Sequence, residues 1–184
     1  MVSVSEALER AGQRGVLLGG WTGLGSGRKE LPPHIYATER APHEWLFPRM
    51  AAVVHHGGAG TTAAALRAGV PAVITPFLAD QPSWARVVHG LGAGPRPVPF
   101  PELTVDRLAA AIKEAVTSPT IHRRAEDVAA ALRAEDGVGR AVALILDYAS
   151  HYPPNPSAAA SGRMTGDAAM RSRAFETELP EKMA

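Results

Sequence analysis

The chain has 184 residues, a formal net charge of +1, and a composition in which 46% of residues are hydrophobic but only 5% are aromatic. The near-zero charge excludes a strongly basic nucleic-acid-binding protein and an acidic disordered protein. Cysteine is absent, which excludes disulfides, thiolate metal sites and a catalytic thiol. Apolar runs such as Ala51–Val54 are far shorter than the roughly 18 residues that span a bilayer. We find no signal peptide at the N-terminus, and we expect a cytoplasmic protein with no membrane span.

Strands and helices are predicted to alternate along the first half of the chain. Helical periodicity over 3–14 precedes an apolar run at 15–21, which is typical of a buried parallel strand. After a Gly-rich loop at 22–33, further strands are predicted at 34–38, 51–55 and 71–77, and helical segments at 44–49, 61–68 and 80–91. This alternation favours an α/β fold with a doubly wound, Rossmann-like parallel sheet covered by helices on both faces.

The second half of the chain is predicted to be helical and then irregular. The segment 96–104 contains too many prolines for a central strand, so we interpret it as an edge crossing. Thr104 is expected to cap a helix whose apolar positions are Val105, Leu108, Ile112 and Val116, and two more helices are expected near 120–135 and 137–149. We therefore assign 1–149 to one domain. The remainder, 150–184, lacks periodicity and is expected to be a mostly disordered tail, with a weak helix possible near 167–178.

The most informative motif is His55-His56-Gly57-Gly58-Ala59-Gly60-Thr61-Thr62, which follows a predicted buried strand and opens a helix. Glycines allow the backbone to approach a ligand closely. A helix N-terminus offers free N–H groups and the positive end of the helix dipole, which together suit a phosphate group. The alternative is an ordinary βα turn rich in small residues.

The two neighbouring histidines are expected to have different roles. Consecutive side chains of a strand point to opposite faces, so His55 and His56 cannot both face one ligand while the strand continues. We therefore do not expect a metal site from this pair. One histidine is expected near the phosphate, and the other is expected to be structural.

A second polar motif, Asp80-Gln81, follows the next predicted strand. Ligands of open α/β sheets bind outside the carboxyl ends of the strands. A carboxylate beside an amide can accept from and donate to vicinal hydroxyls, as on a sugar. The alternative is that Asp80 is the N-cap of a helix that carries Pro82 in its first turn.

Two other glycine-rich segments are not expected to bind phosphate. The segment at 20–29 follows a strand but lacks the Gly-Lys-Ser/Thr ending of the Walker motif. The glycines at 90–94 follow a predicted helix and are explained by C-capping.

Residues 42–94 read PHEWLFPRMAAVVHHGGAGTTAAALRAGVPAVITPFLADQPSWARVVHGLGAG. This segment resembles the C-terminal, donor-binding domain of GT-B, UDP-sugar-dependent glycosyltransferases, in particular the branch that glycosylates sterols, macrolides and other lipophilic acceptors. The resemblance extends more loosely over 1–149. It implies that Asp80 and Gln81 hold the donor sugar and that Arg40 and His43 lie where the nucleobase binds. It also implies that the donor diphosphate is bound by His56, Gly58, Ala59, Gly60 and Thr61.

The resemblance further implies a reaction and an incomplete active site. A hexose would pass from a UDP- or dTDP-sugar to an acceptor hydroxyl with inversion, and neither a metal nor another cofactor would be needed. The catalytic base of this family lies in an N-terminal acceptor domain, so we expect no catalytic residue in this chain and a separate N-terminal chain as partner. We also expect the C-terminal half of a GT-B enzyme without its first strand. The alternatives are a non-catalytic nucleotide-sugar-binding module or a truncated remnant. A nucleotide-sugar epimerase of related fold would also need two domains.

Overall fold

A computed structural model of the chain describes residues 4–19 and 31–151. The chain divides into two compact units, Met1–Glu135 and Asp136–Ala184. The predicted domain boundary at residue 149 stays a prediction, because 152–184 lie outside the described residues. The glycine-rich segment at 20–29 and the weak helix expected near 167–178 lie outside them as well.

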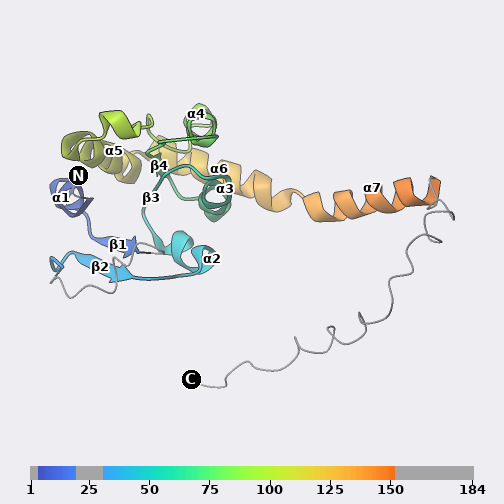
Figure 1. Cartoon of the computed structure of the whole chain (residues 1–184), viewed down its shortest axis with the longest axis horizontal. Helices are drawn as coiled ribbons and strands as arrows, with labels where there is room; N and C mark the ends of the chain where they lie inside the picture. The colour runs from blue at the N-terminus through green and yellow to red at the C-terminus, as the bar shows by residue number, and fades with distance from the viewer. Residues whose placement is uncertain (1–3, 20–30, 152–184) are drawn as a thin grey trace, which may run out of the picture. The chain divides into compact units, whose positions relative to one another are not determined.

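The first unit alternates short strands with helices, in the order that the sequence predicts (Figure 1). Its strands are β1 (Gly15–Leu18), β2 (Ile35–Thr38), β3 (Val53–His55) and β4 (Ala72–Ile74). Its helices are α1 (Val4–Arg10), α2 (His43–Leu46), α3 (Ala59–Ala68), α4 (Gln81–Gly90), α5 (Val105–Thr117) and α6 (Pro119–Ala134), with 3₁₀ turns η2 (Phe47–Arg49) and η3 (Phe100–Glu102). The predicted α/β class is confirmed, and the strands are shorter than the apolar runs that contain them.

The strands form two parallel pairs. β1 pairs with β2 from Gly15↔Ile35 to Leu18↔Thr38, and β3 pairs with β4 from Val53↔Ala72 to His55↔Ile74. Within the described residues, no ladder joins one pair to the other. The proline-rich segment after α4 runs along the end of β4, where Val98 N donates to Ile74 O (3.0 Å), as expected for an edge crossing.

Apolar side chains form two cores, which we name by the helices that supply them. The α3-side core contains residues of α3, α4 and α6 together with Val53 and Ile74, and Val16 and Leu18 pack against it. The α5-side core contains residues of α1 and α5 together with Ile35 and Val73, and Leu17 packs against it. Both strand pairs thus contribute to both cores, and helices cover both faces as in a doubly wound fold.

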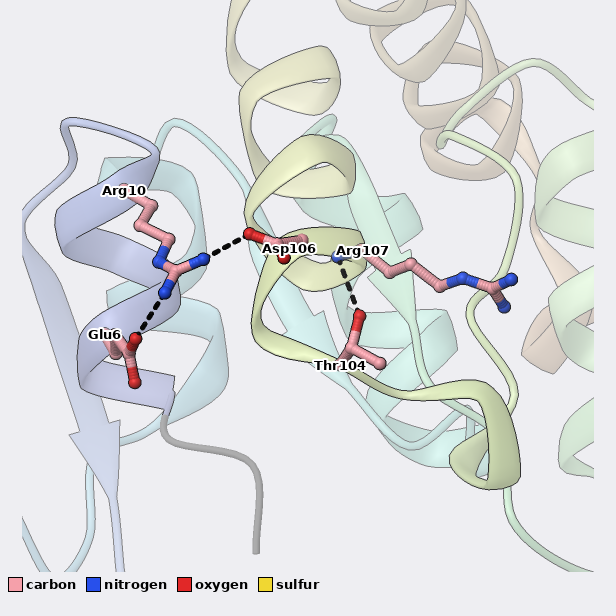
Figure 2. Close-up of polar contacts among 5 residues, drawn as sticks. All are labelled: Glu6, Arg10, Thr104, Asp106 and Arg107. Carbon is pink, nitrogen blue, oxygen red and sulfur yellow. Dashed lines mark hydrogen bonds and ion pairs between the residues drawn. The ribbon is translucent and has the colours of Figure 1, made fainter.

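Helix α1 is attached to α5 by apolar packing and by a surface ion-pair network. Arg10 forms ion pairs with two carboxylates, as Figure 2 shows. Its guanidinium lies 2.6 Å from Glu6 Oε1, and it also contacts Asp106 in the first turn of α5. These side chains are exposed, so the pairs add little stability, and burial of Ala7 and Leu8 in the α5-side core is the main attachment. Thr104 Oγ1 accepts from Arg107 N at 3.2 Å, which confirms the predicted cap of α5 (Figure 2).

The second unit contains α7 (Gly137–His151), which corresponds to the last predicted helix. Its N-terminus is satisfied by Asp136, whose Oδ1 accepts from Gly139 N at 2.9 Å. No residue of α7 is buried. None of the helices in the described part of the chain is long and apolar enough to cross a membrane.

We predict that Gly94→Ala destabilises the first unit by about 1–3 kcal/mol, because overpacking against backbone cannot be relieved by a side-chain rotation. A Cβ at Gly94 would lie 2.1 Å from the carbonyl oxygen of Ala72 in β4. Urea unfolding followed by circular dichroism measures the change.

The matched control is Gly90→Ala at the end of α4, where a Cβ would meet nothing within 4 Å. It should be neutral or stabilise the unit by up to about 1 kcal/mol, because alanine has the higher helix propensity. Equal stabilities of the two variants would contradict the close approach of Gly94 to β4.

Candidate functional site

The candidate site lies where the carboxyl ends of β3 and β4 meet. Thr75 N donates to His55 O at 2.9 Å and continues the ladder past β4. Gly57 has a φ of +94°, and a Cβ on it would lie 2.8 Å from Ile74 Cγ2 and 3.2 Å from Gln81 O. Only glycine accepts this φ without strain, so the turn after β3 can pack directly against the end of β4 and the start of α4.

The turn leads into an N-terminus of α3 that lacks a side-chain cap. Gly58 occupies the cap position, and no acidic residue lies in the first turn. Thr62 N makes the first bond of the helix, to Gly58 O at 2.9 Å, so the N–H groups of Ala59, Gly60 and Thr61 have no acceptor within the helix. A Cβ at Gly60 would meet nothing within 4 Å. This helix end is therefore open, positive and able to bind an anion.

His56 lies beside this helix end. The side chain is exposed, and its Nε2 lies 2.5 Å from where a Cβ of Gly58 would be. The ring centroid of Phe77, in the loop after β4, is 6.1 Å from that of His56. The structure thus brings together His56 and the residues of the glycine motif that the sequence placed around a phosphate.

His55 has the opposite environment from its neighbour. Its Nδ1 accepts a hydrogen bond from Gly57 N at 3.0 Å, so the ring supports the turn. Burial, with a smaller contribution from the charges of His56 and His43, lowers the pKa of His55 from 6.5 to about 4. His55 is therefore neutral at pH 7, with its proton on Nε2, an atom that is buried and has no hydrogen-bond partner among the described residues.

Asp80 and Gln81 start α4 and face different partners. Asp80 is at the N-cap position but makes no side-chain cap bond. Its Oδ2 instead accepts from Trp84 Nε1 at 2.9 Å. The side chain of Asp80 therefore does not cap α4, in contrast to the alternative that the sequence allowed. Gln81 is 6% exposed, and its Oε1 accepts from Phe77 N at 3.0 Å and Leu78 N at 3.2 Å. Gln81 therefore shapes the loop that carries Asp80.

Arg40 and His43 follow the carboxyl end of β2. Thr38 Oγ1 donates to Arg40 O at 3.3 Å in the turn that follows β2. The His43 ring stacks on Phe47 with centroids 4.4 Å apart. Phe47 packs in the α3-side core with Ala65, so the segment after β2 lies beside α3.

Sequence reasoning missed the aromatic residues at this edge. Phe77 and Phe100 are 56% and 63% exposed, and their ring centroids are 6.2 Å apart. The apolar run at 71–77 predicts a strand that includes Phe77, but β4 ends at Ile74 and leaves Phe77 exposed in the loop that follows. In the described ranges, no group of three His, Cys, Asp or Glu side chains could hold a metal ion.

Comparison with known proteins identifies relatives of this chain. Residues 22–148 match the family model described as Erythromycin biosynthesis protein CIII-like, C-terminal domain. A sterol 3-beta-glucosyltransferase of Arabidopsis thaliana is 48% identical over 139 residues, which are 76% of this chain and 22% of that protein. The O-mycaminosyltylonolide 6-deoxyallosyltransferase of Streptomyces fradiae is 42% identical over 149 residues, which are 81% of this chain and 34% of the relative.

A solved structure agrees with these relatives. The glycosyltransferase VinC in complex with dTDP superposes with a TM-score of 0.71 and 27% sequence identity, over 82% of this chain and 38% of VinC. The chain thus spans less than two fifths of the length of each of these three proteins.

We predict that acid destabilises the first unit through His55. The unfolded chain takes up the proton near the ordinary pKa of 6.5 and the folded chain only near 4. The stability due to neutral His55 is therefore complete above pH 6.5 and is lost as the pH falls toward 4, by at most about 3 kcal/mol. Urea unfolding at pH 7.5 and pH 5 measures this loss.

The matched variant is His55→Asn, whose amide oxygen can still accept from Gly57 N but does not titrate. The loss between the two pH values should be smaller in this variant by about 2 kcal/mol. The same loss in both proteins would show that His55 titrates normally in the folded chain.

Proposed function

The chain belongs to the Erythromycin biosynthesis protein CIII-like C-terminal domain family of GT-B glycosyltransferases, and on this premise we propose that it binds the nucleotide-sugar donor of a glycosyl transfer. The observation that carries the proposal is the uncapped N-terminus of α3, with the exposed His56 ring above Gly58. Three free N–H groups, the helix dipole and an imidazole converge on one point, and a diphosphate is an anion of suitable charge and size for them.

Binding of the diphosphate assigns a role to each residue of the glycine motif. Ala59, Gly60 and Thr61 donate their backbone N–H groups, and Gly58 and Gly60 carry no side chain in the way of the ligand. His56 donates from the side of the ring that faces the helix end. Negative charge develops on the leaving diphosphate during transfer, so these donors would stabilise the transition state as well as the bound donor.

The sugar and the nucleobase are assigned to the neighbouring loops. Asp80 would accept from sugar hydroxyls, because the bond from Trp84 orients one carboxylate oxygen and leaves the other for a ligand. Gln81 Oε1 is engaged by Phe77 N and Leu78 N, so its amide Nε2 is the group that would donate to the sugar. Arg40 and His43 would contact the base, which is uracil or thymine. VinC was solved with dTDP, which supports a nucleoside diphosphate at this edge.

The reaction we propose is transfer of a hexose, with inversion, to a hydroxyl of a lipophilic acceptor such as a sterol or macrolide. The acceptor oxygen attacks the anomeric carbon, the bond from that carbon to the diphosphate oxygen breaks, and a general base takes the acceptor proton. We assign no residue of this chain as that base. It would come from an acceptor-binding domain, in keeping with the larger size of the relatives, and no metal is assigned to the reaction.

We predict that His56→Ala weakens binding of UDP and dTDP by about 1–3 kcal/mol, which is roughly five- to 150-fold, because a hydrogen bond to a charged group is lost. Thermal-shift titration of the full chain measures this, since a ligand that binds the folded state raises the midpoint. The matched control is His89→Ala, in the last turn of α4 and away from the N-terminus of α3. This variant should bind UDP and dTDP as the unmodified chain does. Unchanged affinity in His56→Ala would refute its role.

No midpoint shift with UDP, dTDP or UDP-glucose in the unmodified chain would overturn the proposed function itself. Glycosyl transfer from a nucleotide sugar should then not be assigned to this chain.

We predict that Asp80→Ala weakens the binding of UDP-glucose by about tenfold and leaves the binding of UDP unchanged, because only the sugar hydroxyls contact the carboxylate. The ratio of the two dissociation constants, from isothermal calorimetry, reports the sugar contact. Trp84→Phe removes the indole donor and keeps the carboxylate, and it should give a smaller loss of the same kind. Equal weakening of both ligands by Asp80→Ala would make Asp80 a structural partner of Trp84 only.

A further inference from the structure

Two phenylalanine rings lie together and exposed beside His56. Phe77, in the loop after β4, and Phe100, in η3, are 56% and 63% exposed. Their ring centroids are 6.2 Å apart, and the ring planes are inclined at 60°. Single exposed apolar side chains are common on protein surfaces. Two aromatic rings in contact at the edge of a candidate binding site instead form an apolar surface that a ligand can cover.

The backbone holds this Phe77/Phe100 pair in place. Phe100 N donates to Pro76 O at 2.9 Å, which attaches η3 to the loop after β4. In the same loop, Phe77 N and Leu78 N both donate to Gln81 Oε1. Gln81 is 6% exposed, and it thus fixes a loop that turns Phe77 and Leu78 toward solvent. The exposure of the pair is therefore built into the fold and does not result from a loosely held loop.

The same loop contains a strained residue. Ala79 has a φ of +54°, and it is the one residue other than glycine with a positive φ among those that the structure describes. A Cβ makes this left-handed conformation unfavourable. Such strain persists where the surrounding contacts impose it, and it is concentrated at ligand-binding sites. Ala79 immediately precedes Asp80, so the strained turn links the apolar part of the loop to the carboxylate assigned to the sugar.

The pair lies within reach of a sugar carried by the proposed diphosphate. The ring centroid of Phe77 is 6.1 Å from that of His56, a distance comparable to the width of one hexose. Under the proposed function, on which this inference rests, His56 binds the diphosphate and Asp80 binds sugar hydroxyls. The transferred sugar therefore meets a polar group, Asp80, at one end of the loop and an apolar one, Phe77, at the other.

A hexopyranose has one edge that suits each of these contacts. The hydroxyls of carbons C2, C3 and C4 form its polar edge, which carboxylate and amide groups recognise. Carbon C6 extends from C5, on the side of the ring opposite to C2 and C3. When these hydroxyls face Asp80, C6 therefore points away from the carboxylate and toward the Phe77/Phe100 pair.

We propose that the Phe77/Phe100 pair is an apolar subsite for C6 of the transferred sugar. It makes the chain favour a 6-deoxyhexose, whose C6 is a methyl group, over a hexose whose C6 carries a hydroxyl. The two inclined rings contact a methyl group from two sides, which removes apolar surface from water. A hydroxyl in the same place loses its hydrogen bonds to water and gains none from the phenyl rings. Phe77 and Phe100 are thus specificity-determining residues of the donor site.

The test compares two donors that differ only at C6, dTDP-6-deoxyglucose and dTDP-glucose. They carry the same nucleotide and the same hydroxyls at C2, C3 and C4. The ratio of their dissociation constants for the full chain, measured by isothermal calorimetry, therefore reports the contact with C6 alone. We expect the 6-deoxy donor to bind about tenfold more tightly, as for one group added or removed in an apolar pocket. If the chain binds UDP more tightly than dTDP, the same comparison is made with the two UDP donors.

Phe100→Ala removes one ring of the subsite and keeps the backbone N–H that donates to Pro76 O. It should reduce the preference for the 6-deoxy donor to about threefold or less. The affinity for dTDP should not change, because the ring contacts only the sugar. The matched control is Tyr36→Ala, which removes an aromatic side chain of similar exposure, 67%, from β2. This variant should keep the full preference.

Three results would overturn the inference and leave the proposed function intact, provided that the nucleotide itself binds. They are equal affinities of the two donors, tighter binding of the glucose donor, and an undiminished preference in Phe100→Ala. Binding of neither dTDP nor UDP to the unmodified chain would overturn the proposed function and this inference together.

Discussion

The close approach of the turn after β3 to the end of β4 determines the geometry of the site. Gly57, with its positive φ, lies against Ile74 and the first residue of α4. A side chain there would separate the two strand ends and move the N-terminus of α3 away from the loop that carries Asp80. The turn before α3 and the start of α4 can therefore lie in contact because a single position has no Cβ.

Adjacent residues at this edge have opposite environments. His55 is half-buried, neutral and bonded to the turn, whereas His56 is exposed beside the helix end. In the next loop, Gln81 is buried and holds the backbone of Phe77 and Leu78, whereas Asp80 is exposed and oriented by Trp84. In each pair the less exposed member fixes the backbone that presents the exposed one.

The arrangement of the two cores holds the two strand pairs in place without a ladder between them. Both pairs are anchored to helices on both faces, so the edge formed by β3 and β4 does not depend on pairing between β1 and β3. The chain spans less than two fifths of the relatives compared above. Under the proposed function, this chain would bind the donor and another domain would bind the acceptor. Helix α7, in the second unit, has no buried residue.

Hydrophobic periodicity and turn residues in the sequence were sufficient for the order of elements, because helix signals are local. The Thr104 cap and the end of α3 at Ala68 lie where the sequence predicts them. The opposite environments of His55 and His56 also followed from the alternation of a strand. The role of Gln81 and the partner of Asp80 could not be predicted from the sequence, because both depend on loop conformations set by long-range packing. The pairing of strands likewise needed the tertiary structure. An apolar run predicts a buried strand, but only its neighbours in space decide which strand it pairs with. Among the described residues, β1 pairs with β2 and β3 pairs with β4.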